Sequence, residues 1–327
     1  MALPRRSVLC RLIAAALLPV AATAAFADTP YPNKPITLVV PFTAGSGTDV
    51  VARIVSEQLA KVLGQTVIVD NRAGAGGTLG ASLVAAAAPD GYTILVHSAG
   101  HVANAALYPK LKYDTLKDFT PVSMLATLPN VLVVSPSSKI TSVAELVKRA
   151  KASPGKMTYA SAGNGSATHI NAEKFRISAG LQATHVPYRG TPPALMDVAG
   201  GQVDWFFAPI VSAMPLIQEN KLVALAVGSQ KRSPALPKLT TTVEAGFPGS
   251  DYTFWLGMFA PAKVPADVVS KLAAATAKVL QMPEVKAAMD KLGAEPSGLT
   301  QQQFAEQVSR EFEATGALVK QAGIRLD

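Results

Sequence analysis

Two segments far apart in the chain share one pattern and constrain the fold more than any other feature. The first is Pro41-Phe-Thr-Ala-Gly-Ser-Gly-Thr-Asp49 and the second is Ser161-Ala-Gly-Asn-Gly-Ser-Ala-Thr-His169. Each follows a short apolar run and precedes a helix-period pattern, which predicts a strand, a glycine-bearing turn and a helix. Such a turn directs unpaired N–H groups and the positive end of a helix dipole toward one point, which favours an anion. Two turns in one chain predict two lobes that grip one acidic ligand.

Short apolar runs alternate with helical patterns along the whole chain, which is typical of α/β units around a largely parallel sheet. A second series of this kind begins at Met157, so we predict two similar α/β lobes with a ligand cleft between them. The helices expected after Pro265, Pro283 and Thr300 should return to cover the first lobe. We therefore expect residues 28–125 plus 252–327 in lobe 1 and residues 126–251 in lobe 2.

Two helices show clear start or stop signals. An apolar stripe after the first turn recurs at three- and four-residue steps, with Thr48 or Asp49 as the expected N-cap and Gly64 as the C-terminal stop. A capping box formed by Ser142 and Glu145 opens another helix, which should end near Ala152.

The first 27 residues have the features of an export signal. Three arginines precede an apolar core at 12–22, and Ala25-Phe-Ala27 has the small-residue pattern that signal peptidase cuts. The core is too short to span a bilayer and is interrupted by Pro19, which argues against a membrane anchor. Arg5-Arg6 leaves both general secretory and twin-arginine export open. We predict a periplasmic protein that begins at Asp28.

Composition excludes some classes of function. Removing the three signal arginines lowers the formal net charge from +8 to +5, spread over a long chain without clustered Lys or Arg interleaved with aromatic residues. Nucleic-acid binding is therefore not expected. The only cysteine, Cys10, lies inside the signal, so the exported chain has no disulfide. A core of this size does not need one.

Seven motifs occur in one order over most of the chain and together carry a family resemblance. They are Pro41 to Asp49, Asn71-Arg-Ala-Gly-Ala-Gly-Gly77, Pro89-Asp-Gly-Tyr-Thr93, Ser161 to His169, His185-Val-Pro-Tyr-Arg-Gly190, Gly200-Gly-Gln-Val-Asp204 and Glu244-Ala-Gly246. The chain closely resembles the Bug-type substrate-binding proteins of tripartite tricarboxylate transport systems. This resemblance implies a two-lobe periplasmic binding protein that has no cofactor, holds a carboxylate partly through backbone amides and ordered water, and delivers it as a monomer to membrane permease subunits.

The same resemblance places the ligand between the two turns. From lobe 1 it implies Phe42, Thr43, Ala44, Gly45, Ser46, Thr48 and Asp49, and from lobe 2 Ser161, Gly163, Asn164, Gly165, Ser166 and His169. The chain departs from the family at Gly45-Ser46, where two successive glycines are usual. Because Ser46 adds a hydroxyl and narrows backbone freedom, ligand preference can differ from that of relatives.

Several candidate residues keep two interpretations. Asp49 either caps the helix and fixes the loop or binds a ligand that carries an amine or hydroxyl. Asp204 has the same two options, and His169 either donates to the ligand or satisfies a loop carbonyl. Arg189 either pairs with a second carboxylate or lies on the surface. Tyr188 is a candidate for apolar contact with the ligand, as are Phe42, Trp205 and Trp255, although such aromatic residues are more often core.

Two further motifs favour structural roles. His97 and His101 have no acidic or cysteine partner nearby, so a metal site is not predicted. We expect them on the loop after the strand at 94–98, where Ser98 and Asn104 line the cleft. The glycine-rich run at 71–80 lacks the third glycine and the later acidic residue of a dinucleotide fingerprint, so we interpret it as a structural turn.

A receptor is favoured over an enzyme. Ser166 is not in a G-x-S-x-G elbow, and His169 lies three residues on in the same helix, where it is poorly placed to activate the hydroxyl. Besides transport, the sequence leaves open a sensor that docks on a signalling protein and, as a minor alternative, an exported hydrolase. The carboxylate stays undetermined among di- and tricarboxylates, aromatic acids and amino acids.

Overall fold

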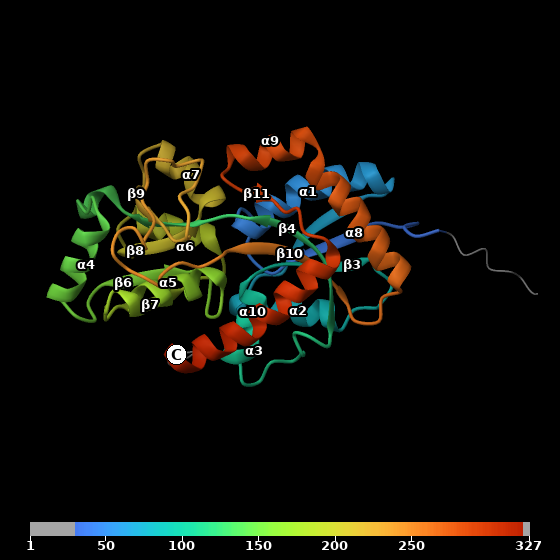
Figure 1. Ribbon diagram of the computed structural model, residues 1–327, viewed down its shortest axis with the longest axis horizontal. Coiled ribbons are helices and arrows are strands. Elements are labelled where there is room, and N and C mark those ends of the chain that lie inside the picture. The colour runs from blue at the N-terminus through green and yellow to red at the C-terminus, as the bar shows by residue number, and fades with distance from the viewer. Residues whose placement is uncertain (1–29, 323–327) are drawn as a thin grey trace, which may run out of the picture. The chain divides into compact units, whose positions relative to one another are not determined.

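The computed structural model describes residues 30–322, in which the strands form two separate sheets with helices packed around them (Figure 1). The predicted export signal at 1–27 lies outside the described residues. None of the helices within 30–322 has the length and apolar character that a membrane span requires. From Tyr31 onward the described chain forms one compact unit.

The first sheet has the strand order β11-β4-β10-β3-β1-β2, and we call the part of the chain built on it lobe 1. Its strands are β1 (Ile36–Val40), β2 (Val67–Asn71), β3 (Thr93–Ser98), β4 (Phe119–Thr127), β10 (Trp255–Pro261) and β11 (Glu295–Pro296). Its helices are α1 (Gly47–Leu63), α2 (Thr78–Ala85), α3 (Gly100–Leu107), α8 (Ala266–Gln281), α9 (Pro283–Lys291) and α10 (Gln301–Ala322), with a 3₁₀ turn η1 (Ala75–Gly77).

The second sheet has the order β7-β6-β8-β5-β9, and we call the part built on it lobe 2. Its strands are β5 (Asn130–Val134), β6 (Thr158–Ser161), β7 (Thr184–Pro187), β8 (Trp205–Pro209) and β9 (Val223–Val227). Its helices are α4 (Val143–Ala152), α5 (Ala167–Ser178), α6 (Thr191–Ala199) and α7 (Ile210–Gln218), with a 3₁₀ turn η2 (Pro136–Ser138).

The sheets are mixed, which corrects the expectation of largely parallel sheets. In lobe 1, β1 pairs in parallel with β2 and β3, whereas β10 is antiparallel to β3 and β4. In lobe 2, β6 pairs in parallel with β7 and β8, whereas β5 is antiparallel to β8 and β9. The strands β5 and β10 enter their sheets directly from the other lobe, without a βαβ crossover, so they run against the local direction.

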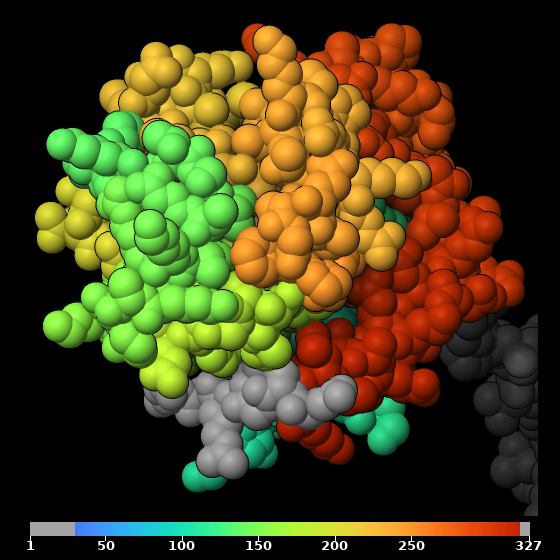
Figure 2. Space-filling view, turned by 60° about the vertical axis from the view of Figure 1, so that its left-hand side comes forward, coloured from blue at the N-terminus to red at the C-terminus, as the bar shows by residue number. Residues whose placement is uncertain are grey.

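Two crossings connect the lobes. The chain passes from β4 to β5 through Leu128 and Pro129, and it returns through the long segment between β9 and β10. Figure 2 shows part of that returning segment, in orange, on the outside of lobe 2 beside α4 in green. One apolar core includes residues of both lobes, and a second core lies within lobe 2 around Phe175 and Trp205.

Several local predictions are confirmed. The helix α1 ends at Gly64, whose φ of 68° is the left-handed conformation that glycine adopts without strain. The hydroxyl of Ser142 accepts the N–H of Glu145 at 3.2 Å and α4 ends at Ala152, as the capping box predicted. The strand β10 joins the first sheet and α8 packs against α1, so the C-terminal segments do cover lobe 1.

Two local predictions were wrong. The N-cap of α1 is Ser46 rather than Thr48 or Asp49, so the helix starts two or three residues earlier than expected. The segment after β3 is the helix α3 rather than a loop. Its N-cap is Ala99, which has no capping side chain, and its first residue is Gly100. Such a start lacks the sequence signal by which a helix N-terminus is recognised.

Candidate functional site

A narrow cavity lies where strands from both lobes end and helices begin. Its lining comes from the turn after β1, the end of β3, the turn after β6, the start of α6, the end of β8 and the segment before β10. The lining residues are Phe42, Ser46, Gly47, Thr48, Ser98, Ala162, Ser166, Ala167, Thr168, Thr191, Pro209 and Phe254. The two turns predicted from the sequence therefore meet in one cavity, which we call the cleft.

The first turn is fixed by its own hydrogen bonds. Gly45 has φ 80°, and the N–H of Ser46 donates to the carbonyl of Thr43 at 3.1 Å. Asp49 reaches back from the first turn of α1 and accepts the N–H of Gly45 at 2.9 Å. Its carboxylate also accepts from Arg53 and Asn71, both at 2.9 Å.

These contacts decide between the two interpretations of Asp49. Burial alone would raise the pKa of its carboxyl, but the hydrogen bonds from Arg53, Gly45 and Asn71 outweigh burial and hold that pKa below its ordinary value. The carboxylate is thus charged, and its partners Gly45, Arg53 and Asn71 are all within lobe 1. Asp49 is absent from the cleft lining, so its position supports the interpretation that it fixes the loop.

The second turn is built in a similar way. Gly163 and Gly165 have φ values of 115° and 76°. Ser166 caps α5 by accepting the N–H of His169 at 3.3 Å, and the Oγ1 of Thr168 accepts the N–H of Ala162 at 2.9 Å. The ring Nδ1 of His169 accepts the N–H of Gly165 at 3.2 Å. His169 therefore holds an amide of the turn, a third possibility beside the two left open by the sequence.

A third helix start, which no sequence motif indicated, reaches the same cleft. Thr191 is the first residue of α6, it is 1% exposed, and its N–H donates to the hydroxyl of Ser46 across the two lobes at 3.1 Å. Pro209 and Phe254 were missed as well. The only available signal for Thr191 was the Pro-Pro pair that follows it, which marks a helix start without saying what it faces.

The lining of the cleft combines hydroxyl-bearing and apolar residues. None of the twelve described lining residues carries a formal charge. The N-terminal residues of α1, α5 and α6 lie in the lining, and N–H groups in a first helical turn have no partner within their own helix. Together with the hydroxyls of the lining serines and threonines, they form a set of neutral hydrogen-bond donors suited to an anion.

Glycines bring the lobes into backbone contact beside the cleft. A Cβ on Gly76 would overlap the carbonyl oxygen of Asn164 in the opposite lobe. A Cβ on Gly100 would lie 2.9 Å from the carbonyl oxygen of Gly165. The run at 71–80 is therefore a structural turn, as predicted, and it also forms part of the contact between the lobes.

Some predicted residues lie away from the cleft lining. The hydroxyl of Tyr188 donates to Asp197 at 2.6 Å, and Arg189 is exposed. Asp204 accepts the N–H of Thr158 at 2.7 Å, at the opposite end of β6 from Ser161, so its position supports a structural role. Trp205 and Trp255 are fully buried core residues, which leaves Phe42 as the only lining residue among the four predicted aromatic candidates.

The expected position of His97 and His101 was also wrong. His97 lies on β3 and His101 on α3, both fully buried, with ring centroids 5.1 Å apart. Burial lowers the pKa of His97 to about 4 and the pKa of His101 well below its ordinary value. Asn104 donates to the carbonyl of Gly76 at 3.2 Å and is not a lining residue. Within 30–322 no group of three metal-ligating side chains occurs.

A serine–histidine contact exists, but not at the pair considered from the sequence. The Nε2 of His185 lies 2.6 Å from the Oγ of Ser161, which also accepts the N–H of Gly163 at 3.0 Å. Burial and the neighbouring His169 lower the pKa of His185 to about 3, so it is a weak base at neutral pH. Ser161 is fully buried and outside the lining, which suits holding the turn in place.

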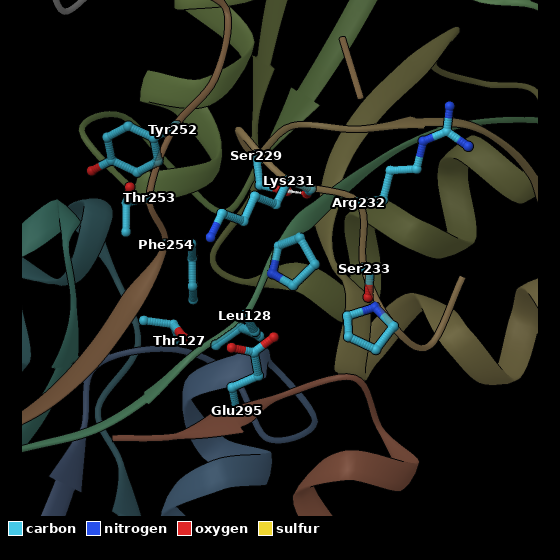
Figure 3. A pocket seen from close by; sticks show the side chains of 12 residues that line it. Thr127, Leu128, Ser229, Lys231, Arg232, Ser233, Tyr252, Thr253, Phe254 and Glu295 are labelled. Atoms are coloured by element: carbon cyan, nitrogen blue, oxygen red, sulfur yellow. Dashed lines mark hydrogen bonds between the residues drawn. The ribbon is translucent and has the colours of Figure 1, made fainter. Parts of the chain in front are cut away.

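A larger cavity of about 200 Å³ lies beside the two crossing segments (Figure 3). It is lined by the end of β4, the segments 229–234 and 252–254, and Glu295 on β11. Lys231 and Glu295 extend toward its middle from opposite lobes, whereas Arg232 points away and pairs with Glu244 at 2.9 Å. It contains no helix start, so the smaller cleft is the better candidate despite its size.

Comparisons with known proteins agree with this geometry. The model of the family described as "Tripartite tricarboxylate transporter family receptor" matches residues 51–324. The chain belongs to this receptor family. Its members are periplasmic solute-binding proteins with the two-lobe fold, and they include Bug proteins. The resemblance seen in the sequence motifs is confirmed.

Three similar proteins illustrate the family. BugT of Bordetella pertussis is 35% identical over 302 residues, which cover 92% of this chain and 92% of BugT. A Rhodopseudomonas palustris protein solved with adipate is 36% identical with a TM-score of 0.87, covering 90% of this chain and 99% of that one. MatC from the same organism, solved with bound malate, is 36% identical with a TM-score of 0.85, covering 88% and 100%.

Proposed function

We propose that this receptor binds one small carboxylate in the cleft between its lobes and delivers it to the membrane permease subunits of a tripartite transporter. One observation carries the proposal: the N-terminal ends of α1, α5 and α6, from both lobes, line a single uncharged cavity. Partial positive charge from several helix ends favours an anion there. The protein acts as a binding protein rather than as an enzyme.

The magnitudes indicate which other contacts are needed. Each helix end contributes about 0.3–1 kcal/mol, and up to about 2 when shielded from water. Micromolar affinity needs about 8 kcal/mol, so three ends supply only part of it. Hydrogen bonds from the hydroxyls and amides of the lining, with apolar contact to Phe42 and Phe254, supply the rest. A neutral donor set also avoids burying a cationic side chain.

The proposed binding residues form two groups. Those in the lining bind directly, and they are Phe42, Thr48, Ser98, Ser166, Thr168, Thr191 and Phe254. Ser46 also lies in the lining, where its hydroxyl accepts the N–H of Thr191. Those behind the lining fix the turns, and they are Thr43, Ala44, Gly45, Asp49, Ser161, Gly163, Asn164, Gly165 and His169. Tyr188, Arg189 and Asp204 are left out because of where they lie.

The remaining expectations belong to the same proposal. The receptor works as a periplasmic monomer, with lobe boundaries at 28–125 plus 252–327 and at 126–251. The adipate and malate complexes of two relatives support a small carboxylate, in particular a dicarboxylate, as the ligand. The family description supports delivery to a transporter over signalling. Copurification of the tagged receptor with its permease subunits, dependent on added ligand, tests the delivery step.

Binding is tested by calorimetry with adipate, malate, benzoate and glutamate on wild type and on Ser166→Ala. Ser166 lines the cleft and caps α5, so its hydroxyl contributes both to the site and to the turn. We expect at least one acid to bind, and Ser166→Ala to weaken that binding about tenfold. The matched control is Ser309→Ala on the exposed face of α10, which should bind like wild type. Failure of every acid to bind, or equal affinity in both serine variants, contradicts the proposal.

A further inference from the structure

The hydroxyl of Ser46 joins the lobes inside the cleft. It accepts the N–H of Thr191 at 3.1 Å and lies 3.3 Å from the hydroxyl of Thr43. Ser46 and Thr191 are only 2% and 1% exposed, so solvent does not compete for this bond. A Cβ on Gly190, in the opposite lobe, would overlap the Oγ1 of Thr43, which shows how closely the loops of the two lobes approach.

This bond occupies a donor that suits a ligand carboxylate. Thr191 is the first residue of α6, so its N–H has no partner within the helix. Ser46 is the N-cap of α1, but its side chain makes no capping bond to that helix. Its hydroxyl is instead directed across the cleft. A neutral hydroxyl thus occupies a position at the positive ends of two helices, where an anionic oxygen would bind more strongly.

The closed arrangement leaves no room for a metabolite. The cleft has a volume of about 10 Å³, which is near the minimum for one water molecule. Two further bonds hold the lobes together: Ser212 donates to the carbonyl of Gly45, and Tyr108 donates to the carbonyl of Asn164, both at 2.9 Å. A carboxylate of the size of malate cannot enter while these contacts persist.

We propose that Ser46 is an internal competitor of the ligand. Its hydroxyl holds the N–H of Thr191 in a closed form that excludes ligand, and the carboxylate takes that N–H when it binds. The inference rests on the proposed function and adds a residue that sets affinity. Because the closed form binds nothing, its population lowers the apparent affinity by the fraction of molecules left able to bind. Removing the hydroxyl should therefore tighten binding.

The test compares Ser46→Ala with wild type by calorimetry, using adipate and malate as probes. The net contribution of one hydrogen bond corresponds to a change of about two- to tenfold, so the Kd of Ser46→Ala should be lower by that factor. Ser46→Gly is a second variant, because its φ of −66° is accessible to either residue, and it should act in the same direction. An unchanged or higher Kd in both variants overturns the proposal.

Two comparisons separate this inference from the proposed function. Ser166→Ala removes another lining hydroxyl, but its partners are all within lobe 2, so it should weaken binding where Ser46→Ala strengthens it. Hydrogen exchange of the Thr191 amide reports on the interlobe bond without ligand, and exchange should accelerate in Ser46→Ala. Faster exchange with no binding of any acid would reject the function and the competition but keep the bond. If an acid binds but exchange of the Thr191 amide is unchanged in Ser46→Ala, the interlobe bond and the competition are rejected, whereas the proposed function stands.

Discussion

Replacing His101 by phenylalanine should make the protein more stable and less sensitive to acid. The His101 ring is fully buried, and rings of Tyr113, Phe119 and Phe259 pack on it with centroids 5.7, 4.8 and 4.9 Å away. Neither ring nitrogen has a hydrogen-bond partner among the described residues. The only charge that shifts its pKa is that of His97. Phenylalanine keeps the ring contacts and removes two unpaired polar atoms.

The sign of the pH effect follows from where protons bind. In the unfolded chain a histidine has a pKa of about 6.5, whereas burial lowers the pKa of His97 to about 4 and that of His101 well below normal. Below pH 6.5 the unfolded state therefore binds more protons than the native state. The contribution of these histidines to the free energy of unfolding is therefore fully present above pH 6.5. It decreases as the pH falls below 6.5, until the native histidines themselves take up protons.

The size of the effect can be worked out for a buried histidine that stays neutral in the native state. Between pH 7 and pH 5, the free energy of unfolding drops by about 1.9 kcal/mol for each such residue. His97 and His101 together account for a drop of about 4 kcal/mol. The variant His101→Phe should lose about 1.9 kcal/mol less than wild type over this range, because His97 and His185, whose pKa is also lowered, are present in both proteins. The low pKa values of Asp49 and Glu173 act below this window, near pH 4.

Urea unfolding at pH 7 and at pH 5 measures these differences, with equal m-values showing that the same transition is compared. Glu311 has a pKa raised by burial and acts in the opposite direction, but it is present in both proteins and cancels in the comparison. The reasoning is refuted if His101→Phe loses as much stability between pH 7 and pH 5 as wild type does.

Three further substitutions test other parts of the structure. Gly76→Ala should prevent close contact of the lobes and enlarge the radius of gyration in solution scattering, whereas Gly155→Ala, with a similar φ but open space around it, should change stability alone. Asn171→Ala should cost about 1–3 kcal/mol in urea unfolding, because it leaves the amide of buried Asn130 without its acceptor; an unchanged midpoint would contradict this. Asp49→Asn should cost about 1 kcal/mol at pH 7, since its partner Arg53 is half exposed. Because the native pKa of Asp49 is lowered, that difference should disappear as the pH falls below about 4, and a pH-independent difference would be inconsistent with the assigned charge.

Local signals in the sequence predicted most of the elements well. The glycine turn after β1, the stop at Gly64 and the capping box at Ser142 each depend on neighbouring residues, and all three occur as predicted. The helix α3 was missed because its start has no capping residue. The antiparallel strands β5 and β10 could not be recognised as such, because strand direction depends on which lobe the chain comes from.

The residues of the candidate site likewise fall into those that belong to a local motif and those that do not. Ser46 and Ser166 belong to the motifs themselves, so the sequence placed them in one cavity. Thr191, Pro209 and Phe254 reach that cavity only because α6 begins there, β8 ends there and β10 begins just after Phe254, and no local pattern records this. Their omission reflects the long sequence separations involved, such as that between Thr191 and Ser46.

The glycines near the cleft show why the features that local motifs do not predict depend on the tertiary structure. Gly45 and Gly165 have positive φ, which a turn motif can predict. Gly190 has an extended backbone that any residue could adopt, yet a side chain there would collide with Thr43 of the other lobe. Gly47 is helical, and its Cβ would lie 2.8 Å from that of Pro209 across the cleft. These two positions require glycine for contact between the lobes, so substitution there should affect closure before it affects the folding of either lobe.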